Sequence, residues 1–276
     1  MNAHTDSAPV TLTDWQDLFW KRRGGKLLNY STSEICLRLV EASGYIAEAV
    51  RRNKYYLIIG ELGKGLGRLL DVYNRVAYDE NFKDLFKVNH NGFKGLEASI
   101  FDKFPKRCFY CGGVHCECHI LFGDTDERTT EDEKKAHSLA NEALRLARLN
   151  ETPPKTLDEY DAMFARVYGQ GHRYSDLDSI NHHLMEEIGE IAKAHRHVME
   201  SVKNGIVFDE QKNQEISPDK CRDNFCSEIA DALSWIVAIR RKSEYHILKA
   251  IKEGDRKPDV PKLSQTVAEF LNQDSI

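Results

Sequence analysis

The sequence lacks the long apolar runs that a membrane protein needs. No segment of the 276-residue chain approaches the roughly 18 consecutive apolar residues of a membrane span. The polar N-terminus, residues 1–10, has neither the basic nor the apolar region of a signal peptide. We therefore expect a cytoplasmic protein without a membrane partner, and a disordered stretch over residues 1–10.

Proline, glycine and excess positive charge are also scarce. The chain holds only 7 Pro and 17 Gly, too few for a collagen-like or low-complexity protein. Its formal net charge of -5 gives no overall positive field that would attract a phosphate backbone, so we do not expect nucleic acid as a partner. No run alternates with period two, and we expect an all-α fold apart from a Cys-rich segment.

An internal repeat organises the helical part of the chain. Residues 11–19 resemble residues 156–164, which lie 145 positions later. The same offset of 145 aligns the second predicted helix of the first copy with that of the second copy. The third predicted helices align at an offset of 167 instead. The second copy therefore carries 22 extra residues within its loop 200–223. We expect two copies of one helical unit, over residues 11–78 and 155–252, packed as an intramolecular pseudo-dimer.

The remaining segments have no counterpart in the other copy. An insert, residues 79–154, separates the copies, and a C-terminal tail covers residues 253–276. Helical periodicity predicts helices near 93–104 and 134–150 in the insert, and one near 262–272 in the tail. The expected fold is thus a tandem repeat with one insert and a tail.

Acidic residues of the second copy form a pattern typical of a metal site. Glu187 and Glu190 lie three apart on one predicted helix, and Glu228 and Asp231 lie three apart on the next, so each pair projects together. Both pairs border an apolar stripe with no Lys evident nearby, where charge is costly unless a cation offsets it. Oxygen ligands favour Mg²⁺ or Mn²⁺. The plainer alternative is a pair of solvated, salt-bridged helix faces.

A family resemblance makes this pattern more specific. Glu186-Glu187-x-x-Glu190 followed by Glu228-x-x-Asp231 resembles the EExxE…ExxD signature of the MazG-like all-α nucleoside triphosphate pyrophosphohydrolases, a superfamily that includes dimeric dUTPases. The resemblance covers residues 156–249 well, covers 11–78 as a degenerate copy, and leaves out the insert. The 37 residues between Glu190 and Glu228 exceed the usual family spacing, which bears on loop geometry and substrate choice.

The resemblance implies a fold, an activity and a set of ligands. The fold would be tandem MazG-like helical bundles, and the activity a Mg²⁺-dependent cleavage of a (d)NTP at the α-phosphorus, giving the nucleoside monophosphate and pyrophosphate. Another pyrophosphate-containing nucleotide is a nearby alternative substrate. Glu187, Glu190, Glu228 and Asp231 would bind the metal, with Glu186 as an auxiliary catalytic carboxylate.

Several residues near these carboxylates are candidates for binding the nucleotide substrate. They are Lys193 and Lys242 for phosphate, Asn224, Trp235 for stacking on a base, and His182 and His183 for phosphate. Each has a plainer interpretation, as a surface lysine or a core aromatic residue.

The first copy keeps too few acids to bind metal in the same way. Ala42, Tyr45 and Lys64 stand at positions aligned with three of the four carboxylates, and only Glu41 and Glu61 persist. Members of the superfamily pair their units into tight bundles, so the resemblance implies that this copy is a silent partner and that each chain has one active site. Association of two chains is left open.

Four cysteines crowd into eleven residues of the insert, and they are Cys108, Cys111, Cys116 and Cys118. The first two open a CxxCG turn typical of a zinc knuckle. Without an export signal, such a cluster favours a structural Zn²⁺ over disulfides. His115 or His119 could replace one thiolate, and unligated thiols are the plainer alternative.

A second class of function remains open on the sequence alone. The chain could be a zinc-containing nucleic-acid- or protein-binding helical module without catalysis. Its footprint would be the basic run Lys103–Arg107 together with Phe109 and Tyr110. The negative net charge and the unexplained carboxylates stand against this alternative.

Overall fold

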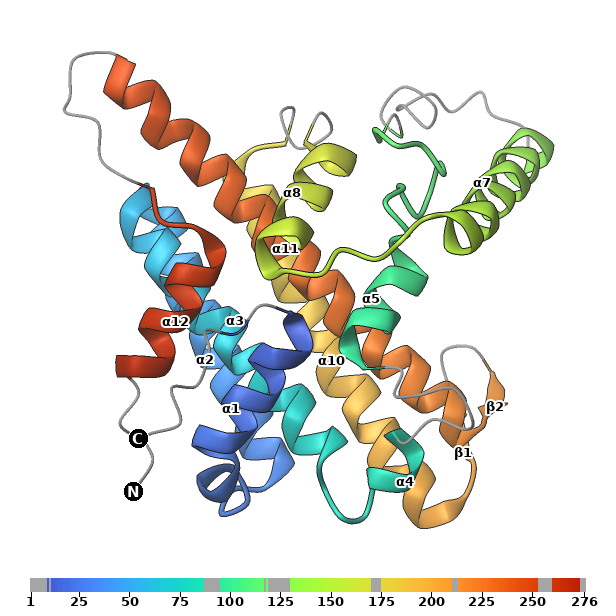
Figure 1. Ribbon diagram of the computed structural model, residues 1–276. Coiled ribbons are helices and arrows are strands. Elements are labelled where there is room, and N and C mark those ends of the chain that lie inside the picture. The colour runs from blue at the N-terminus through green and yellow to red at the C-terminus, as the bar shows by residue number, and fades with distance from the viewer. Residues whose placement is uncertain are drawn as a thin grey trace.

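A computed structural model describes the chain over residues 9, 11–86, 95–116, 118, 130–169, 175–209, 213–252 and 260–273. The described chain is predominantly helical, which confirms the all-α prediction (Figure 1). The helices are α1 Leu12–Leu27, α2 Thr32–Arg51, α3 Tyr55–Ala77, α4 Lys83–Phe86, α5 Leu96–Lys103, α7 Thr130–Asn150, α8 Leu157–Tyr168, α10 Leu177–Asn204, α11 Pro218–Lys252 and α12 Leu263–Gln273. None of them combines the length and apolar composition needed to cross a bilayer.

Capping boxes fix the start of three of these helices. Thr11, Ser31 and Thr156 precede α1, α2 and α8, and each hydroxyl accepts a hydrogen bond from the backbone N–H three residues later. The acidic residue at that position accepts in return from the backbone N–H of the cap. This exchange satisfies two N–H groups that a helix start otherwise leaves without partners.

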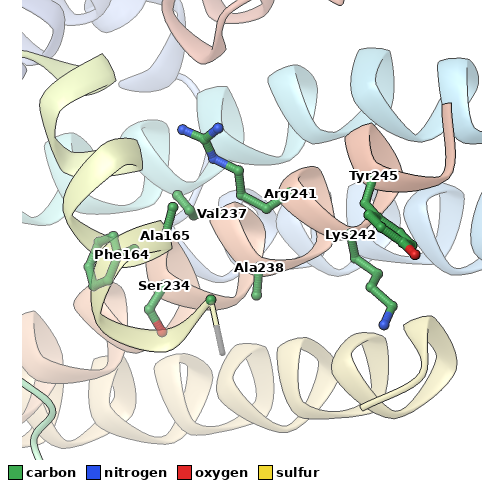
Figure 2. Close-up of a pocket in the computed structure, with 9 residues that line it drawn as sticks. Phe164, Ala165, Ser234, Val237, Ala238, Arg241, Lys242 and Tyr245 are labelled. Carbon is green, nitrogen blue, oxygen red and sulfur yellow. The ribbon is translucent and has the colours of Figure 1, made fainter. Parts of the chain in front are cut away.

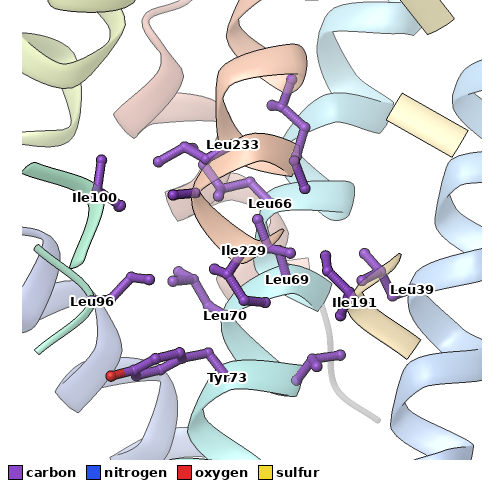
Figure 3. Close-up of a cluster of buried hydrophobic side chains, with 14 of the residues drawn as sticks. Leu39, Leu66, Leu69, Leu70, Tyr73, Leu96, Ile100, Ile191, Ile229 and Leu233 are labelled. Carbon is purple, nitrogen blue, oxygen red and sulfur yellow. The ribbon is translucent and has the colours of Figure 1, made fainter. Parts of the chain in front are cut away.

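Four long helices form the central bundle. Helix α2 packs on α3, α10 packs on α11, and the two pairs meet where α3 contacts α11 and α2 contacts α10. Leu66 and Leu69 of α3, Ile229 and Leu233 of α11 and Ile191 of α10 interdigitate in the core (Figure 3). Each buried aliphatic side chain contributes about 1.5–3 kcal/mol. Helices α1 and α12 cover α3, while α5 and α8 lie against α11.

The insert, the tail and loop 200–223 follow most of the sequence-based expectations. The predicted helices near 93–104, 134–150 and 262–272 correspond to α5, α7 and α12. The expected disorder of residues 1–10 falls, except for residue 9, outside the described residues. One prediction needs correction, because loop 200–223 contains an antiparallel hairpin of β1 Val207–Asp209 and β2 Gln214–Ile216. Strands of three residues are too short to show a period in the sequence.

Two glycines of α3 allow α12 to approach closely. A Cβ atom on Gly63 would lie 2.6 Å from the carbonyl oxygen of Thr266, and one on Gly67 would overlap the ring of Phe270. We expect Gly63→Ala to lower the free energy of unfolding by about 1–3 kcal/mol, because backbone must move to admit the methyl group.

Gly60 provides the matched control for this prediction. It lies on the same helix, where an added Cβ meets nothing within 4 Å. Gly60→Ala should stabilise the protein by up to about 1 kcal/mol, the helix-propensity difference between the two residues. Urea unfolding measures both variants, and equal midpoints would refute the close α3–α12 contact.

Candidate functional site

Three acidic side chains from two neighbouring helices converge. Glu187 and Glu190 of α10 and Glu228 of α11 each offer a carboxylate oxygen, and these oxygens all lie within 4.8 Å of one another. Helices α10 and α11 pack against each other, so a pair of acids spaced one turn apart on α10 can face the acid on α11. The structure thus brings together three of the four predicted metal ligands.

Burial makes this cluster electrostatically unusual. Removal from water is the main reason that the pKa of Glu187 is raised to about 7, and the nearby carboxylates of Asp231, Glu190 and Glu228 raise it further. The pKa of Glu228 is also raised to about 7, again chiefly by burial, although Lys103 acts in the opposite direction. Acids held this close repel one another unless positive charge lies between them.

The two oxygens of Glu187 differ in their surroundings. Oε1 accepts a hydrogen bond from Nε1 of Trp235 at 3.1 Å. Oε2 is buried and has no hydrogen-bond partner within the described part of the chain. A buried, unpartnered carboxylate oxygen beside two other carboxylates is suited to a hard divalent cation, so the donor set fits Mg²⁺ or Mn²⁺.

Asp231, the fourth predicted ligand, has a different partner. Its carboxylate forms an ion pair with Lys103 of α5 and is not one of the three converging acids. Nζ of Lys103 also donates to Oγ of Ser227 at 2.7 Å. The expectation that no lysine lies near these carboxylates is therefore wrong, because the insert brings one from 128 positions away.

Glu186 lies toward solvent. Its side chain is 69% exposed, and Oε2 lies 2.9 Å from Nδ1 of His183. The His183 ring in turn stacks on Trp235, with ring centroids 4.6 Å apart. His183, Trp235 and Glu187 thus form a chain of contacts from Glu186 to the converging acids.

A cavity of about 240 Å³ adjoins the carboxylates. Its wall includes Glu187, Asp231 and Trp235 from α10 and α11, and Lys103, Phe109 and Tyr110 from the insert. Charged groups are thus combined with several aromatic rings. This composition suits a ligand that has both a charged and a planar part.

A second cavity, of about 400 Å³, lies between α8 and α11 (Figure 2). Ser234 lines both cavities, so they adjoin. Lys242, which the sequence suggests as a substrate-binding lysine, lines this second cavity, whereas Lys193 and Asn224 line neither. Lys193 lies one turn after Glu190 on α10, and Asn224 lies one turn before Glu228 on α11.

The four cysteines of the insert form a cluster that could hold a metal such as zinc. Their sulfur atoms all lie within 4.8 Å of one another, and Sγ of Cys108 is 3.5 Å from Sγ of Cys116 and 3.6 Å from Sγ of Cys118. Tetrahedral zinc with Zn–S bonds of about 2.3 Å requires sulfur separations of about 3.8 Å. All four are free thiols. Gly112 has φ +69°, which glycine adopts without strain.

The cysteine cluster is docked on the C-terminal end of α8. The backbone N–H of Cys116 donates to the carbonyl of Val167 at 2.6 Å, and Nδ1 of His115 lies 2.9 Å from the carbonyl of Arg166. Carbonyls in the last turn of a helix have no hydrogen-bond partner within that helix. The cysteine cluster supplies such partners and so caps the C-terminal end of α8. His115 is thereby directed to α8, while the other histidine considered, His119, lies outside the described residues.

A zinc measurement tests the cysteine cluster directly. We expect protein purified without chelator to carry about one equivalent of Zn²⁺, and Cys111→Ser to lose most of it because tetrahedral coordination needs all four ligands. Cys36→Ala, which alters a buried thiol of α2, should keep the metal. Less than half an equivalent in the unaltered protein would contradict a tetrathiolate site.

The cavity-lining residues that the sequence did not place beside the acids come mostly from the insert. In the sequence, Lys103, Phe109 and Tyr110 form part of a basic and aromatic run, and no local pattern places that run beside Asp231. Comparison of the chain with protein-family models, with curated proteins and with solved structures finds no match. The chain's own geometry offers three converging acids, an aromatic cavity and a thiol cluster that contributes to the wall of this cavity.

Proposed function

We propose that the chain is a Mg²⁺-dependent nucleotide pyrophosphohydrolase that cleaves a (d)NTP at the α-phosphorus. The convergence of Glu187, Glu190 and Glu228, with one buried oxygen that has no described partner, carries this proposal. A solvated acidic helix face does not account for acids at a core edge with a pKa raised to about 7. The resemblance of these residues to the MazG-like signature supports the same reading.

The residues around the acids suit a nucleotide. Mg²⁺ or Mn²⁺ held by the three carboxylates would supply positive charge that offsets the charge of the triphosphate. Trp235 orients Glu187 by its hydrogen bond and presents an aromatic ring to the adjoining cavity. Lys242 is the candidate for a more distant phosphate, and Glu186 keeps an auxiliary role.

The proposal includes the duplication of the helical unit. Thr11 and Thr156, which are 145 positions apart, pair with each other in an antiparallel bridge. Pairing between equivalent residues is expected where two copies are related by a local twofold axis. The bridge therefore supports an intramolecular pseudo-dimer.

A contact between the first and third helices occurs at aligned positions in both copies, which supports the alignment offsets of 145 and 167. Gln16 of α1 bonds to Asn74 of α3, with Nδ2 of Asn74 donating to the Gln16 carbonyl at 2.9 Å. At the positions 145 and 167 residues later, Asp161 of α8 pairs with Arg241 of α11 at 2.5 Å. The first and third helices of each copy are thus joined at equivalent positions, by a neutral pair in one copy and by an ionic pair in the other.

In the first copy, only Glu61 remains at a position aligned with the four predicted metal ligands, and a lysine of the same helix pairs with it. Lys64 stands at the position aligned with Asp231, and its Nζ lies 2.8 Å from Oε1 of Glu61. Glu61 is aligned with Glu228, so a lysine accompanies the acid where the second copy has another acid. This arrangement supports one active site per chain, in the second copy.

The alternative of a nucleic-acid-binding zinc module loses much of its basis. Lys103 of the basic run is paired with Asp231, and Nζ of Lys106 lies 3.5 Å from Glu151. Lys106 is therefore engaged by an acid of the same chain. Lys103 lines a cavity of about 240 Å³, which suits a small ligand rather than a phosphate backbone. Within the described residues, no specific contact favours this second function over hydrolysis.

A nucleotide panel tests the proposed activity. With Mg²⁺ or Mn²⁺, we expect release of pyrophosphate and the monophosphate from at least one dNTP or NTP, and with chelator we expect none. Pyrophosphate is measured enzymatically and the nucleotides by ion-exchange chromatography. Release of orthophosphate alone, or turnover unaffected by chelator, would exclude this reaction at this site.

A further inference from the structure

We propose that the insert forms part of the nucleotide site, with Lys103 binding a substrate phosphate and the rings of Phe109 and Tyr110 contacting the base. The cysteine cluster would then hold these side chains in position, in addition to stabilising the fold of the insert. This inference rests on the proposed function, because it assigns the parts of the same substrate to further residues.

The shared cavity is the first observation. Lys103, Phe109 and Tyr110 line it together with Glu187, Asp231 and Trp235. Cys116 and Cys118 contribute to the same wall, so the thiol cluster lies directly beside the cavity. With the adjoining cavity at Ser234, the space falls within the roughly 300–1,000 Å³ typical of small-molecule sites.

The charge balance of the site is the second observation. Four carboxylates lie at or beside this site, and a triphosphate brings further negative charge. One divalent cation does not offset all of these charges, so a second cation lowers the repulsion that the incoming substrate meets. Lys103 is the insert's cation here, and its ammonium is largely buried against Asp231 and Ser227.

The donors of Lys103 leave room for a phosphate oxygen. A lysine ammonium has three donors. Asp231 and the hydroxyl of Ser227 take two of them, and the remaining contact, to the Ser227 carbonyl, is long at 3.5 Å. The rings of Phe109 and Phe104 lie 5.5 and 5.8 Å from the ammonium, which keeps it out of bulk water.

The position of the aromatic rings in the knuckle is the third observation. Phe109 and Tyr110 are the two residues between Cys108 and Cys111, so any metal held by these thiolates fixes the turn that carries both rings. Phe109 is 41% exposed and Tyr110 is 60% exposed, although both line the cavity. Exposed rings at the edge of a cavity can stack on a base without displacing core side chains.

Nucleotide binding without turnover tests this inference. Isothermal titration with the α,β-imido analogues of dATP, dCTP, dGTP and dUTP, in the presence of Mg²⁺, measures affinity for wild type and variants. We expect Lys103→Met and Tyr110→Ala each to raise the dissociation constant of the tightest-binding analogue about tenfold or more. Loss of a charge-assisted hydrogen bond or of a stacked ring has an effect of this size. Lys106→Met, in the same insert, and Tyr56→Ala, on α3, are matched controls and should remain within about twofold.

The cysteine cluster is tested by a third variant with a separate readout. The Cys111→Ser variant should lose zinc and bind the nucleotide analogue more weakly. Its Glu187, Glu190 and Glu228 should still bind Mn²⁺, which electron paramagnetic resonance measures. If circular dichroism shows that this variant is unfolded, the Lys103 and Tyr110 variants decide the question alone.

The outcomes separate this inference from the proposed function. Analogue affinity that depends on Lys103 and Tyr110 supports the inference, even if no nucleotide is hydrolysed and the proposed activity fails. Equal affinity in all variants overturns the inference, even if wild type hydrolyses nucleotides. Failure of every analogue to bind wild type also overturns it.

Discussion

Glu190→Gln should reduce metal-dependent pyrophosphate release by about 10³-fold, because a catalytic cation contributes several kcal/mol and each 1.36 kcal/mol is a factor of ten. The amide has nearly the shape of the acid but lacks its charge, so it binds a divalent cation poorly. Glu190 is an exposed residue of the three-acid cluster, and its replacement should leave the fold intact. Turnover, Mn²⁺ affinity and circular dichroism together measure this prediction.

Glu200→Gln is the matched control for that experiment. Glu200 lies on the same helix, ten positions later, where its carboxylate is 3.5 Å from Arg196. Its loss should change neither turnover nor Mn²⁺ affinity. If Glu190→Gln kept the turnover of wild type while folding normally, the three acids would have to be reinterpreted as a structural cluster.

The three converging acids were predictable because their arrangement depends on local rules. Spacing of three on a helix places Glu187 and Glu190 on one side, and the apolar stripes of the two helices indicate which sides meet. The same geometry explains why Glu186 behaves differently from its neighbour. One residue along a helix is a rotation of about 100°, which turns Glu186 toward solvent and His183.

The pairing of Lys103 with Asp231 was not predictable in this way. A sequence pattern identifies partners on the same helix, three or four positions apart, whereas these two residues are 128 positions apart. Their contact depends on how the insert docks, which is governed by hydrogen bonds such as that from Cys116 to the end of α8. No periodicity encodes such a contact, so the sequence alone predicts Asp231 as a metal ligand without its lysine partner.

The helices themselves were easier to predict than the short strands. Long amphipathic segments repeat their period several times, and paired Thr-x-x-acid starts mark where α1 and α8 begin. The hairpin of β1 and β2 has three residues in each strand, too few for alternation to be distinguished from chance. Antiparallel pairing between the strands, rather than local propensity, explains this hairpin.

Asp71→Ala should lower the free energy of unfolding by about 3–5 kcal/mol, the usual consequence of removing one partner from a buried ion pair. Asp71 is fully buried on α3 and accepts from Nε of Arg23 at 3.0 Å and from Nη2 at 2.7 Å. Arg23 on α1 is only 3% exposed, so its charge would remain in the core without the carboxylate that matches it. The shift in the urea midpoint measures the loss.

Two further variants distinguish the buried charge from lost packing. In Arg23→Met with Asp71→Leu, the charges of this pair are replaced by apolar groups, and most of the stability should return, because an apolar pair avoids desolvation altogether. Arg68, whose Nη1 lies 3.3 Å from Asp71, keeps its charge in this variant, but its side chain is 16% exposed and can turn its guanidinium toward solvent. Glu142→Ala removes an exposed partner of Arg145 on α7 and should leave the midpoint unchanged. If the double variant were as unstable as Asp71→Ala, the cost could not come from an unpaired buried charge. Loss of the specific ion-pair contact between α1 and α3 would then explain the destabilisation.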